Sequence, residues 1–231
     1  MLLSAIFDFD ETMVLLEEQH TAAAARLARE MGDDYERMPE AFRHRSGFRV
    51  VDDVDEMRRF FGWRDDLDSL YARRLELFLV ECREHPVSLL PGVAEAIAAL
   101  EGRGMKLAIA SSGLRPSIEE ILDNLGLRTR FRAIIGGEDV TKGKPDPEPY
   151  LRAAAALGVA PSNCLVFEDS FVGVAAAKAA GTVCVGVRNP AAKICQDLEA
   201  SDLVIDGFPA LDLDAIATRW GLPEARSKRM A

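Results

Sequence analysis

Apolar residues follow one pattern up to about residue 90 and another after it. From about residue 91 onward, short apolar runs alternate with segments in which apolar residues recur every three or four positions. This predicts strands that alternate with helices. The predicted strands are 106–110, 131–135, 164–167, 182–187 and a short last one at 203–205. The predicted helices are 92–100, opened by Pro91-Gly92, then 116–125, 148–157 and 172–180. Such alternation is typical of a parallel sheet with helices on both faces.

A first strand is predicted near the N-terminus, where Leu2, Leu3 and residues 5–7 form an apolar run that a strand buried on both faces requires. No convincing strand follows before Met105; helices are predicted over 15–31, 38–44, 51–61 and 67–84. We therefore predict an α/β fold. Residues 1–15 and 89–231 form a Rossmann-like, doubly wound parallel sheet core, and residues 16–88 an all-helical cap domain inserted after its first strand.

Composition limits the function classes. The chain has 231 residues, 48% of them hydrophobic, enough for one large domain or two of unequal size. A net charge of -10 argues against nucleic-acid binding, which needs clustered lysine and arginine. No apolar run approaches the ~20 residues that span a bilayer, and Met1-Leu2-Leu3 leads to aspartates rather than to a signal-peptide cleavage site. We expect a cytoplasmic protein with no membrane partner, a monomer or weak homodimer.

The four cysteines are not spaced like a metal site or a disulfide framework. They lie far apart, with no CxxC pair, at Cys82, Cys164, Cys184 and Cys195. Two of them fall in apolar, strand-like runs. We expect buried free thiols rather than a disulfide framework or a zinc site.

Polar residues stand just after several predicted apolar runs. They are Asp8 and Asp10, Ser111, Lys144, and the pair Glu168-Asp169. The carboxyl ends of parallel strands share one edge of a sheet, where α/β proteins bind ligands, so these side chains can converge there. The alternative is that Asp10-Glu11-Thr12 is only a turn, that Lys144 is a surface residue before Pro145, and that Glu168-Asp169 caps a helix.

Converging carboxylates require a cation. Four carboxylates would repel one another, and one lysine cannot balance them. Oxygen ligands without nearby histidine or cysteine favour Mg²⁺. A carboxylate nucleophile, Mg²⁺, a lysine and a strand-end serine are the groups that phosphoryl transfer through an aspartyl-phosphate needs. A second carboxylate two residues along is placed to protonate the leaving oxygen and then to take a proton from water.

These motifs resemble the haloacid dehalogenase superfamily, in its phosphatase and phosphomutase branch with a helical cap after the first strand. The chain is similar to β-phosphoglucomutase-like enzymes from Ile6 to about Val187. The resemblance is carried by the common order of four motifs: Asp8-Phe9-Asp10-Glu11-Thr12, Ser111, Lys144-Pro145-Asp146-Pro147, and Glu168-Asp169-Ser170 with Gly173.

The resemblance implies a role for each core residue. Asp8 would be the nucleophile and a metal ligand, and Asp10 the general acid/base and a metal ligand through its backbone carbonyl. Ser111 and Lys144 would bind the transferring phosphoryl group, Lys144 also steadying Asp8. Asp169 would bind the metal directly, and Glu168 either directly or through another group.

Two positions refine the resemblance. Dehalogenase members lack a carboxylate at the position of Asp10 and use no metal, so its presence points to phosphate esters. The family usually has glycine where this chain has Glu11. A glutamate there either tolerates the local turn or adds a charge near the mouth of the site.

Several residues are candidates for substrate binding. Residues 42–49 hold three arginines and a histidine, either a solvated helix end or part of a cap pocket for an anionic or polyhydroxylated substrate. By resemblance, Arg49 sits where mutases contact a distal phosphate. His20 matches a hinge-helix histidine that couples cap closure to acid/base work, or is simply a solvated helix residue. Ser112, and Arg115 after the Ser111-Ser112-Gly113 turn, are further candidates for the substrate. Trp63 with Phe60-Phe61 is expected in the cap core.

We therefore expect a Mg²⁺-dependent phosphatase of a small phosphate ester, a sugar or polyol phosphate, that acts through a phospho-Asp8 intermediate. One alternative is a β-phosphoglucomutase-like hexose-phosphate mutase, in which Arg49 and His20 play the mutase roles. In both, the core makes the phospho-aspartate and the cap decides whether water or a sugar hydroxyl receives the phosphoryl group. A third possibility is a non-catalytic protein that binds a phosphate ligand.

Overall fold

The computed structural model describes residues 1–43, 47–190 and 196–225. In these ranges six strands form one parallel sheet in the order β3-β2-β1-β4-β5-β6. The strands are β1 (Ser4–Phe7), β2 (Lys106–Ala110), β3 (Ala133–Ile135), β4 (Cys164–Glu168), β5 (Val183–Val187) and β6 (Leu203–Ile205). The predicted doubly wound sheet is confirmed. The strand predicted at 131–135 begins only at Ala133, because the Phe131 N–H closes a 3₁₀ turn at Arg128–Arg130.

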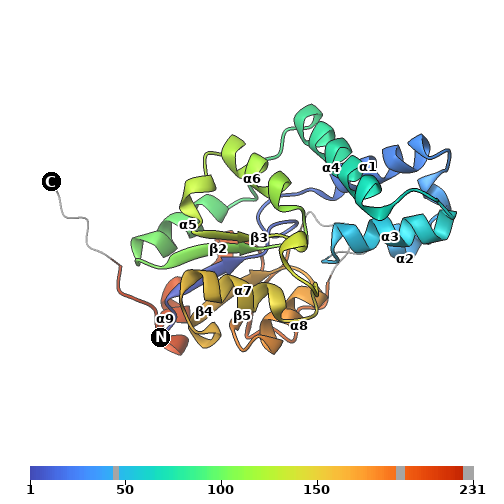
Figure 1. The fold of residues 1–231 in the computed structure, drawn as a ribbon. Helices are drawn as coiled ribbons and strands as arrows, with labels where there is room; N and C mark the ends of the chain where they lie inside the picture. The colour runs from blue at the N-terminus through green and yellow to red at the C-terminus, as the bar shows by residue number, and fades with distance from the viewer. Residues whose placement is uncertain (44–46, 191–195, 226–231) are drawn as a thin grey trace.

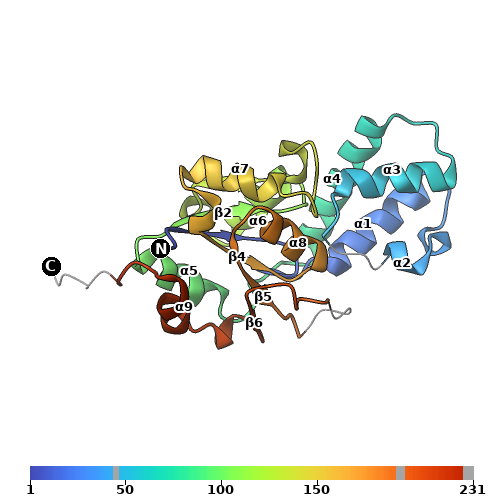
Figure 2. The same cartoon turned by 90° about the horizontal axis from the view of Figure 1, so that it is seen from below.

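Helices cover both faces of the sheet because its central strand is apolar on both. Ala5 and Phe7 pack on one face and Ile6 on the other. The first face is covered by α5 (Val93–Gly102), α6 (Arg115–Asn124) and α9 (Leu213–Trp220); the second by α7 (Glu148–Leu157) and α8 (Phe171–Ala179). Figure 2 shows the sheet between α7 on one side and α5 and α9 on the other. Helix α9 was not predicted; it is a short helix, and its cap residue Asp212 accepts the N–H groups of Asp214 and Ala215.

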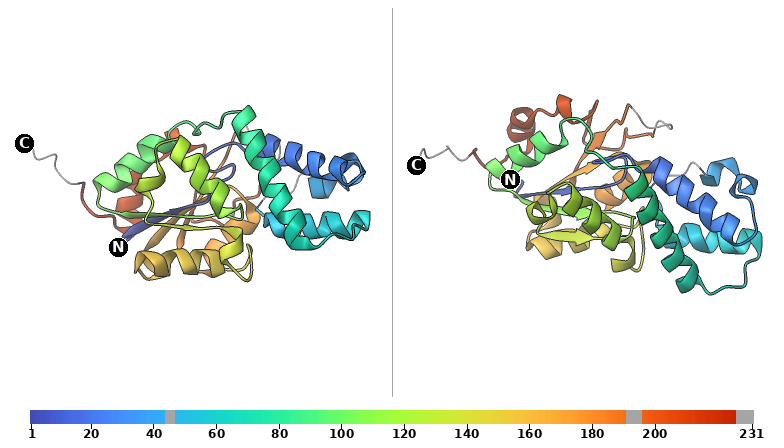
Figure 3. Two further views of the ribbon diagram at one scale, coloured as in Figure 1. Left: turned by 45° about the horizontal axis from the view of Figure 1, so that its top comes forward. Right: turned by 90° about the horizontal axis from the view of Figure 1, so that it is seen from above.

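Four helices form a separate unit beyond the carboxyl ends of the strands (Figures 1 and 3). They are α1 (Glu17–Glu30), α2 (Glu40–Arg43), α3 (Val50–Phe61) and α4 (Leu67–Glu84). Helix α3 ends at Gly62, whose φ of 74° is left-handed, and α4 begins after Asp66, whose side chain accepts the Ser69 N–H. Helix α2 begins at Glu40 rather than at the predicted Met38, and His44 lies outside the described residues.

The expected aromatic core of this helical unit is only partly correct. Trp63 is buried and stacks on Phe61 with ring centroids 5.2 Å apart, and its indole N–H donates to Asp33. Phe60 is 47% exposed, so its assignment to the core was wrong. The apolar stripe of α3 runs through Val50, Val54 and Met57, and Phe60 lies at the exposed end of the helix, one turn beyond it.

The described cysteines are free thiols. Cys164 and Cys184 are buried, as predicted, whereas Cys82 is only half-buried; Cys195 lies outside the described residues. Over residues 1–43, 47–190 and 196–225, no helix has the length and apolar character that crossing a membrane would require.

Candidate active site

Three buried carboxylates meet at the carboxyl edge of the sheet. Asp8 directly follows β1, Glu168 ends the neighbouring strand β4, and Asp169 is the next residue. Each offers an oxygen within 4.8 Å of an oxygen of the others. The structure thus brings these three of the predicted residues together, because the β1–β4 register sets Phe7 beside Phe167 and brings both strands to an end together.

Lys144 joins this cluster from the loop before α7. Its Nζ donates to Asp8 Oδ1 and to Glu168 Oε1, both at 2.5 Å, and its side chain is 1% exposed. This excludes the alternative of a surface turn residue. Burial alone would lower the pKa of Lys144, but the charges of Asp8 and Glu168 outweigh it and raise the pKa. For Asp8 burial dominates and raises the pKa to about 7, against the pull of Lys144.

Glu168 is fully occupied by protein donors. Its Oε1 accepts from Lys144 and from the Tyr150 hydroxyl at 2.7 Å, and its Oε2 accepts the N–H and the hydroxyl of Ser170 at 2.9 and 3.0 Å. The carboxylate lies so close to Gly173 that a Cβ there would sit 1.7 Å from Oε1. These four donors occupy the lone pairs of the carboxylate. The arrangement therefore favours Glu168 as the group that holds Lys144, rather than as a direct metal ligand.

Tyr150 was not among the residues predicted for the site. It lies on the buried face of α7, six residues after Lys144, and it is fully buried. The available signal was chemical: a tyrosine on an otherwise apolar helix face needs a partner for its hydroxyl, and the nearest candidates were the strand-end carboxylates.

The donor set suits Mg²⁺. Asp8 and Asp169 each have one oxygen that receives no hydrogen bond from the described residues, while Thr12 donates to Asp169 Oδ1 at 2.9 Å. The pKa of Asp169 is raised by burial, and further by Glu168 and Asp8. Three buried carboxylates beside one ammonium group leave an excess negative charge that a hard divalent cation with oxygen ligands would neutralise.

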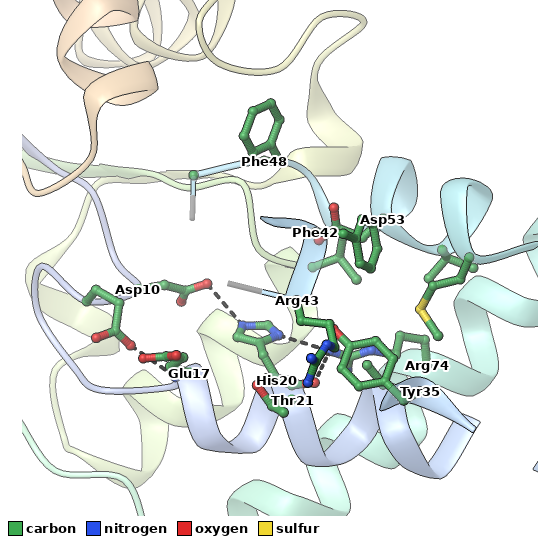
Figure 4. Close-up of a pocket in the computed structure, with 16 residues that line it drawn as sticks. Asp10, Glu17, His20, Thr21, Tyr35, Phe42, Arg43, Phe48, Asp53 and Arg74 are labelled. Atoms are coloured by element: carbon green, nitrogen blue, oxygen red, sulfur yellow. Dashed lines mark hydrogen bonds and ion pairs between the residues drawn. The ribbon is translucent and has the colours of Figure 1, made fainter. Parts of the chain in front are cut away.

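The Asp10 side chain points toward His20 on α1 of the helical unit (Figure 4). Its Oδ2 lies 3.2 Å from His20 Nε2. His20 Nδ1 in turn lies 3.2 Å from Arg74 Nη2 on α4. A guanidinium group only donates, so Nδ1 accepts, and the proton of a neutral His20 sits on Nε2 and is donated to Asp10. Arg74 was not singled out from the sequence, because one arginine in a charged helix carries no signal.

Ser111 and Ser112 have different surroundings. Ser111 Oγ accepts the Gly113 N–H at 2.9 Å, and a Cβ on Gly113 would lie 3.2 Å from that oxygen and 3.3 Å from Asp10 Oδ2. Ser111 and Asp10 therefore flank one point above the strand ends. Ser112 Oγ instead donates to the Gly47 carbonyl at 2.7 Å and ties the core to the helical unit.

The structure does not bring Arg49 or Arg115 to the cluster. Arg49 forms a bidentate ion pair with Asp52, donates to the carbonyls of Val140 and Thr141 at 3.2 Å, and packs on Gly143. It therefore bridges the helical unit to the loop that carries Lys144. Arg115 is half-exposed beside Glu119 and Asp139.

The structure explains Glu11. Among the described residues it is the single non-glycine residue with positive φ, at 61°, in the region that favours the glycine usual in the family. Its carboxylate accepts the N–H groups of Leu16 and Glu17 at 2.9 and 3.0 Å, at the start of α1. Of the two alternatives, the structure shows the first: Glu11 adopts the turn. Its carboxylate also caps the start of α1, which the sequence did not predict. This capping also explains why α1 begins at Glu17 rather than at Leu15.

Comparison with known proteins agrees with this geometry. The family model of haloacid dehalogenase-like hydrolases matches residues 4–181. The chain is 34% identical over 184 residues to validoxylamine A 7'-phosphate phosphatase of Streptomyces hygroscopicus subsp. limoneus, covering 79% of this chain and 84% of that protein. It is 29% identical over 226 residues to beta-phosphoglucomutase of Bacillus subtilis (strain 168), covering 94% and 95%.

A solved structure extends the likeness to the fold. CbbY from Rhodobacter sphaeroides, crystallised in complex with phosphate, superimposes with a TM-score of 0.77 at 26% identity, over 90% of this chain and 95% of that one. The match therefore includes the helical unit as well as the sheet. The chain belongs to the haloacid dehalogenase-like hydrolase family.

Proposed function

We propose that the protein is a Mg²⁺-dependent phosphatase of a small phosphorylated metabolite, a sugar or polyol phosphate, that forms a phospho-Asp8 intermediate. The observation that carries this proposal is the buried Lys144, which holds one oxygen of Asp8 and leaves the other oxygen available beside Asp169. The similarity to validoxylamine A 7'-phosphate phosphatase supports the same reaction class.

In the first step, Asp8 attacks the phosphorus atom of the ester while the bond from phosphorus to the leaving oxygen breaks. Asp10 gives its proton to that oxygen. Lys144 orients Asp8, and the Ser111 hydroxyl is placed to bind the transferring group. Asp8, Asp169 and the Asp10 backbone carbonyl would hold Mg²⁺, which supplies positive charge opposite the phosphoryl oxygens.

In the second step, Asp10 takes a proton from water, and the water oxygen attacks phosphorus. Phosphate leaves and the Asp8 carboxylate is restored. His20 donates to Asp10 Oδ2, so Oδ1 is the oxygen that carries the proton in each step. His20 therefore acts as a positioning residue.

The proposal is tested by phosphate release from a panel of sugar and polyol phosphates, with Mg²⁺ or with EDTA. We expect Mg²⁺-dependent release by the wild type and a loss of at least ~10³-fold in Asp8→Asn. Asp65→Asn, an exposed carboxylate outside the site, is the matched control. Release by Asp8→Asn at the wild-type rate would reject the phospho-aspartate route, and a folded, Mg²⁺-binding wild type with no turnover would favour a binding protein.

A hexose-phosphate mutase is the second candidate, because His20 contacts Asp10 as the resemblance to mutases implies. Arg49 does not favour it, since its guanidinium is already paired with Asp52 and bonded to two carbonyls. Incubation with β-glucose 1-phosphate and a trace of the bisphosphate separates the two reactions. Glucose 6-phosphate formed without free phosphate would replace the hydrolase assignment with the mutase.

A further inference from the structure

A small pocket lies between the candidate acid/base and the helical unit. Its volume is about 120 Å³, well below the ~300–1,000 Å³ of pockets for drug-sized ligands. Asp10 and His20 line one part of its wall, and Tyr35, Arg43, Asp53 and Arg74 line others (Figure 4). A substrate whose ester oxygen faces Asp10 would therefore place the rest of a small molecule near these residues.

Arg74 is the unusual member of this wall. It is 5% exposed, and burial lowers the pKa of its guanidinium to about 10, so it keeps its charge at pH 7. Its Nη2 donates to the His20 carbonyl at 2.8 Å and to His20 Nδ1. Its Nη1 is buried and has no hydrogen-bond partner among the residues that the structure describes. Within the described ranges, no carboxylate lies at ion-pair distance from it, although Asp53 lines the same pocket and attracts it.

A buried guanidinium group with an unbonded N–H donor and no carboxylate at ion-pair distance is unfavourable without a ligand. A buried ion is normally paired, and a buried donor is normally bonded, because each loses its hydration on burial. Arg43, on the same pocket wall, shows the ordinary arrangement: it is paired with Glu36 and donates to the Met38 carbonyl. A hydroxyl group would satisfy the donor at Arg74 but would leave its charge without a counterion; an anionic oxygen satisfies both.

We infer that Arg74 binds a second anionic group of the substrate, a carboxylate or a second phosphate, through Nη1 while the ester phosphate lies at Asp8. This inference rests on the proposed function and narrows it to small phosphate monoesters that carry another negative charge. It also moves the expected anion contact of the helical unit from Arg49, just before α3, to Arg74 on α4.

The test compares esters that differ in one group. 3-Phosphoglycerate and glycerol 3-phosphate differ by a carboxylate in place of a hydroxymethyl group; 1,3-propanediol bisphosphate and 3-hydroxypropyl phosphate differ by a phosphate in place of a hydroxyl. We expect the wild type to favour the anionic member of at least one pair at least ~10-fold in kcat/KM, as a charged hydrogen bond at a desolvated site provides. Which pair responds identifies the anion.

The variants are chosen to separate charge from positioning. Arg74→Gln keeps a donor for His20 and removes the charge, so the preference should fall to below ~3-fold, mainly through KM of the anionic ester. Arg74→Lys should restore part of it. Arg43→Gln is the matched control and should leave the preference within ~3-fold, because Arg43 is already paired. If Arg74→Gln lowered kcat/KM equally for both members of each pair, Arg74 would act only through His20. If Arg43→Gln reduced the preference for the anionic ester as much as Arg74→Gln does, the assignment to Arg74 would be wrong.

Direct binding keeps the inference independent of turnover. Calorimetry with Asp8→Asn and with Asp8→Asn/Arg74→Gln measures the affinity for both members of each pair. A preference of at least ~10-fold that disappears in the double variant supports the anion subsite even if no ester is hydrolysed, in which case the phosphatase proposal alone fails. Equal affinity for both members, with p-nitrophenyl phosphate still hydrolysed by the wild type, would reject the anion subsite but would not affect the phosphatase proposal.

Discussion

Two buried cations, one in the core and one in the helical unit, have opposite surroundings. Lys144 in the core is held by Asp8 and Glu168 at 2.5 Å, and these charges raise its pKa. Arg74 has no carboxylate at ion-pair distance among the described residues, and burial lowers its pKa to about 10. The first cation is satisfied by the protein itself, whereas the second leaves a donor and a charge to be satisfied.

This difference separates two tasks. The core groups needed for phosphoryl transfer are oriented by the protein, which limits the reorganisation that the reaction itself would require. The pocket of the helical unit is left incomplete, so a substrate that completes it gains interaction energy that other phosphate esters do not gain. Chemistry would thus be common to the family, and selection among substrates specific to this chain.

Asp10 lies between the two regions, and its replacement gives the largest expected effect. Asp10→Asn keeps the backbone carbonyl and leaves the Asp8-Lys144-Glu168 network unchanged, so Mg²⁺ binding should persist. It removes the proton donor, and turnover should fall by about 10²–10⁴-fold. The measurement is kcat together with Mg²⁺ affinity by calorimetry. Unchanged turnover would reject the acid/base role, and lost Mg²⁺ affinity would show that the side chain binds the metal.

Removal of each cation tests the comparison directly. Lys144→Met leaves two buried carboxylates without their counterion and should lower the free energy of unfolding by about 3–5 kcal/mol. Arg74→Met removes a buried charge that has no ion pair, so the loss should stay below ~1.5 kcal/mol, from the bonds to His20. Urea unfolding at pH 7 measures both. Equal losses would mean that the protein satisfies Arg74 as fully as it satisfies Lys144.

The sequence predicted the core cluster around Lys144 better than the pocket around Arg74, for a physical reason. Asp8, Glu168 and Asp169 lie at strand ends, which a parallel sheet brings together whatever the helices do. Lys144 lies in the loop before α7, and the family resemblance, rather than a strand end, placed it in the site. Arg74 acquires its environment only from the packing of α1 against α4, which places it beside His20. No periodicity or spacing along the chain records such a contact.

Two further residues show the same limit of prediction from sequence. Tyr150 contacts Glu168 because α7 covers one particular face of the sheet, and the sequence predicted the helix without predicting that contact. Arg49 was assigned to the substrate by resemblance, yet Asp52, one turn along α3, pairs with its guanidinium. The local motifs therefore come together as the resemblance implied, whereas the helical unit is mixed: His20 contacts Asp10, and Arg49 is paired within its own unit.

Metal removal gives a pH-dependent effect in the core. Burial raises the pKa of Asp8 from 3.8 to about 7 in the metal-free protein. Between these values the folded state binds a proton that the unfolded state has lost, so this carboxyl group's contribution to stability falls as pH rises through the window. Mg²⁺ needs the ionised carboxylate, and its binding must release that proton.

The stabilisation by Mg²⁺ should therefore be small at pH 5.5 and several degrees in Tm at pH 7.5, measured by thermal unfolding in Mg²⁺ against EDTA. Asp169→Asn, which lacks a proposed ligand, should show little Mg²⁺ response at either pH. A Mg²⁺-induced shift of the same size at both pH values would contradict the protonation of this site.

The smallest effect concerns Glu11, which lies between strand β1 and α1, the first helix of the helical unit. Glu11→Ala keeps a side chain at a φ of 61° and loses the bonds to the N–H groups of Leu16 and Glu17, so it should lower the free energy of unfolding by about 1–2 kcal/mol. Glu11→Gly loses the same bonds but relieves the backbone strain, so its loss should be smaller by about 1 kcal/mol. Because this change touches neither cation, the ~10-fold or larger preference for anionic esters should survive in both variants. If Glu11→Gly lowered the free energy of unfolding as much as Glu11→Ala, strain at this turn would be negligible. Loss of the preference for anionic esters would mean that the start of α1, rather than Arg74 alone, sets the geometry of the pocket.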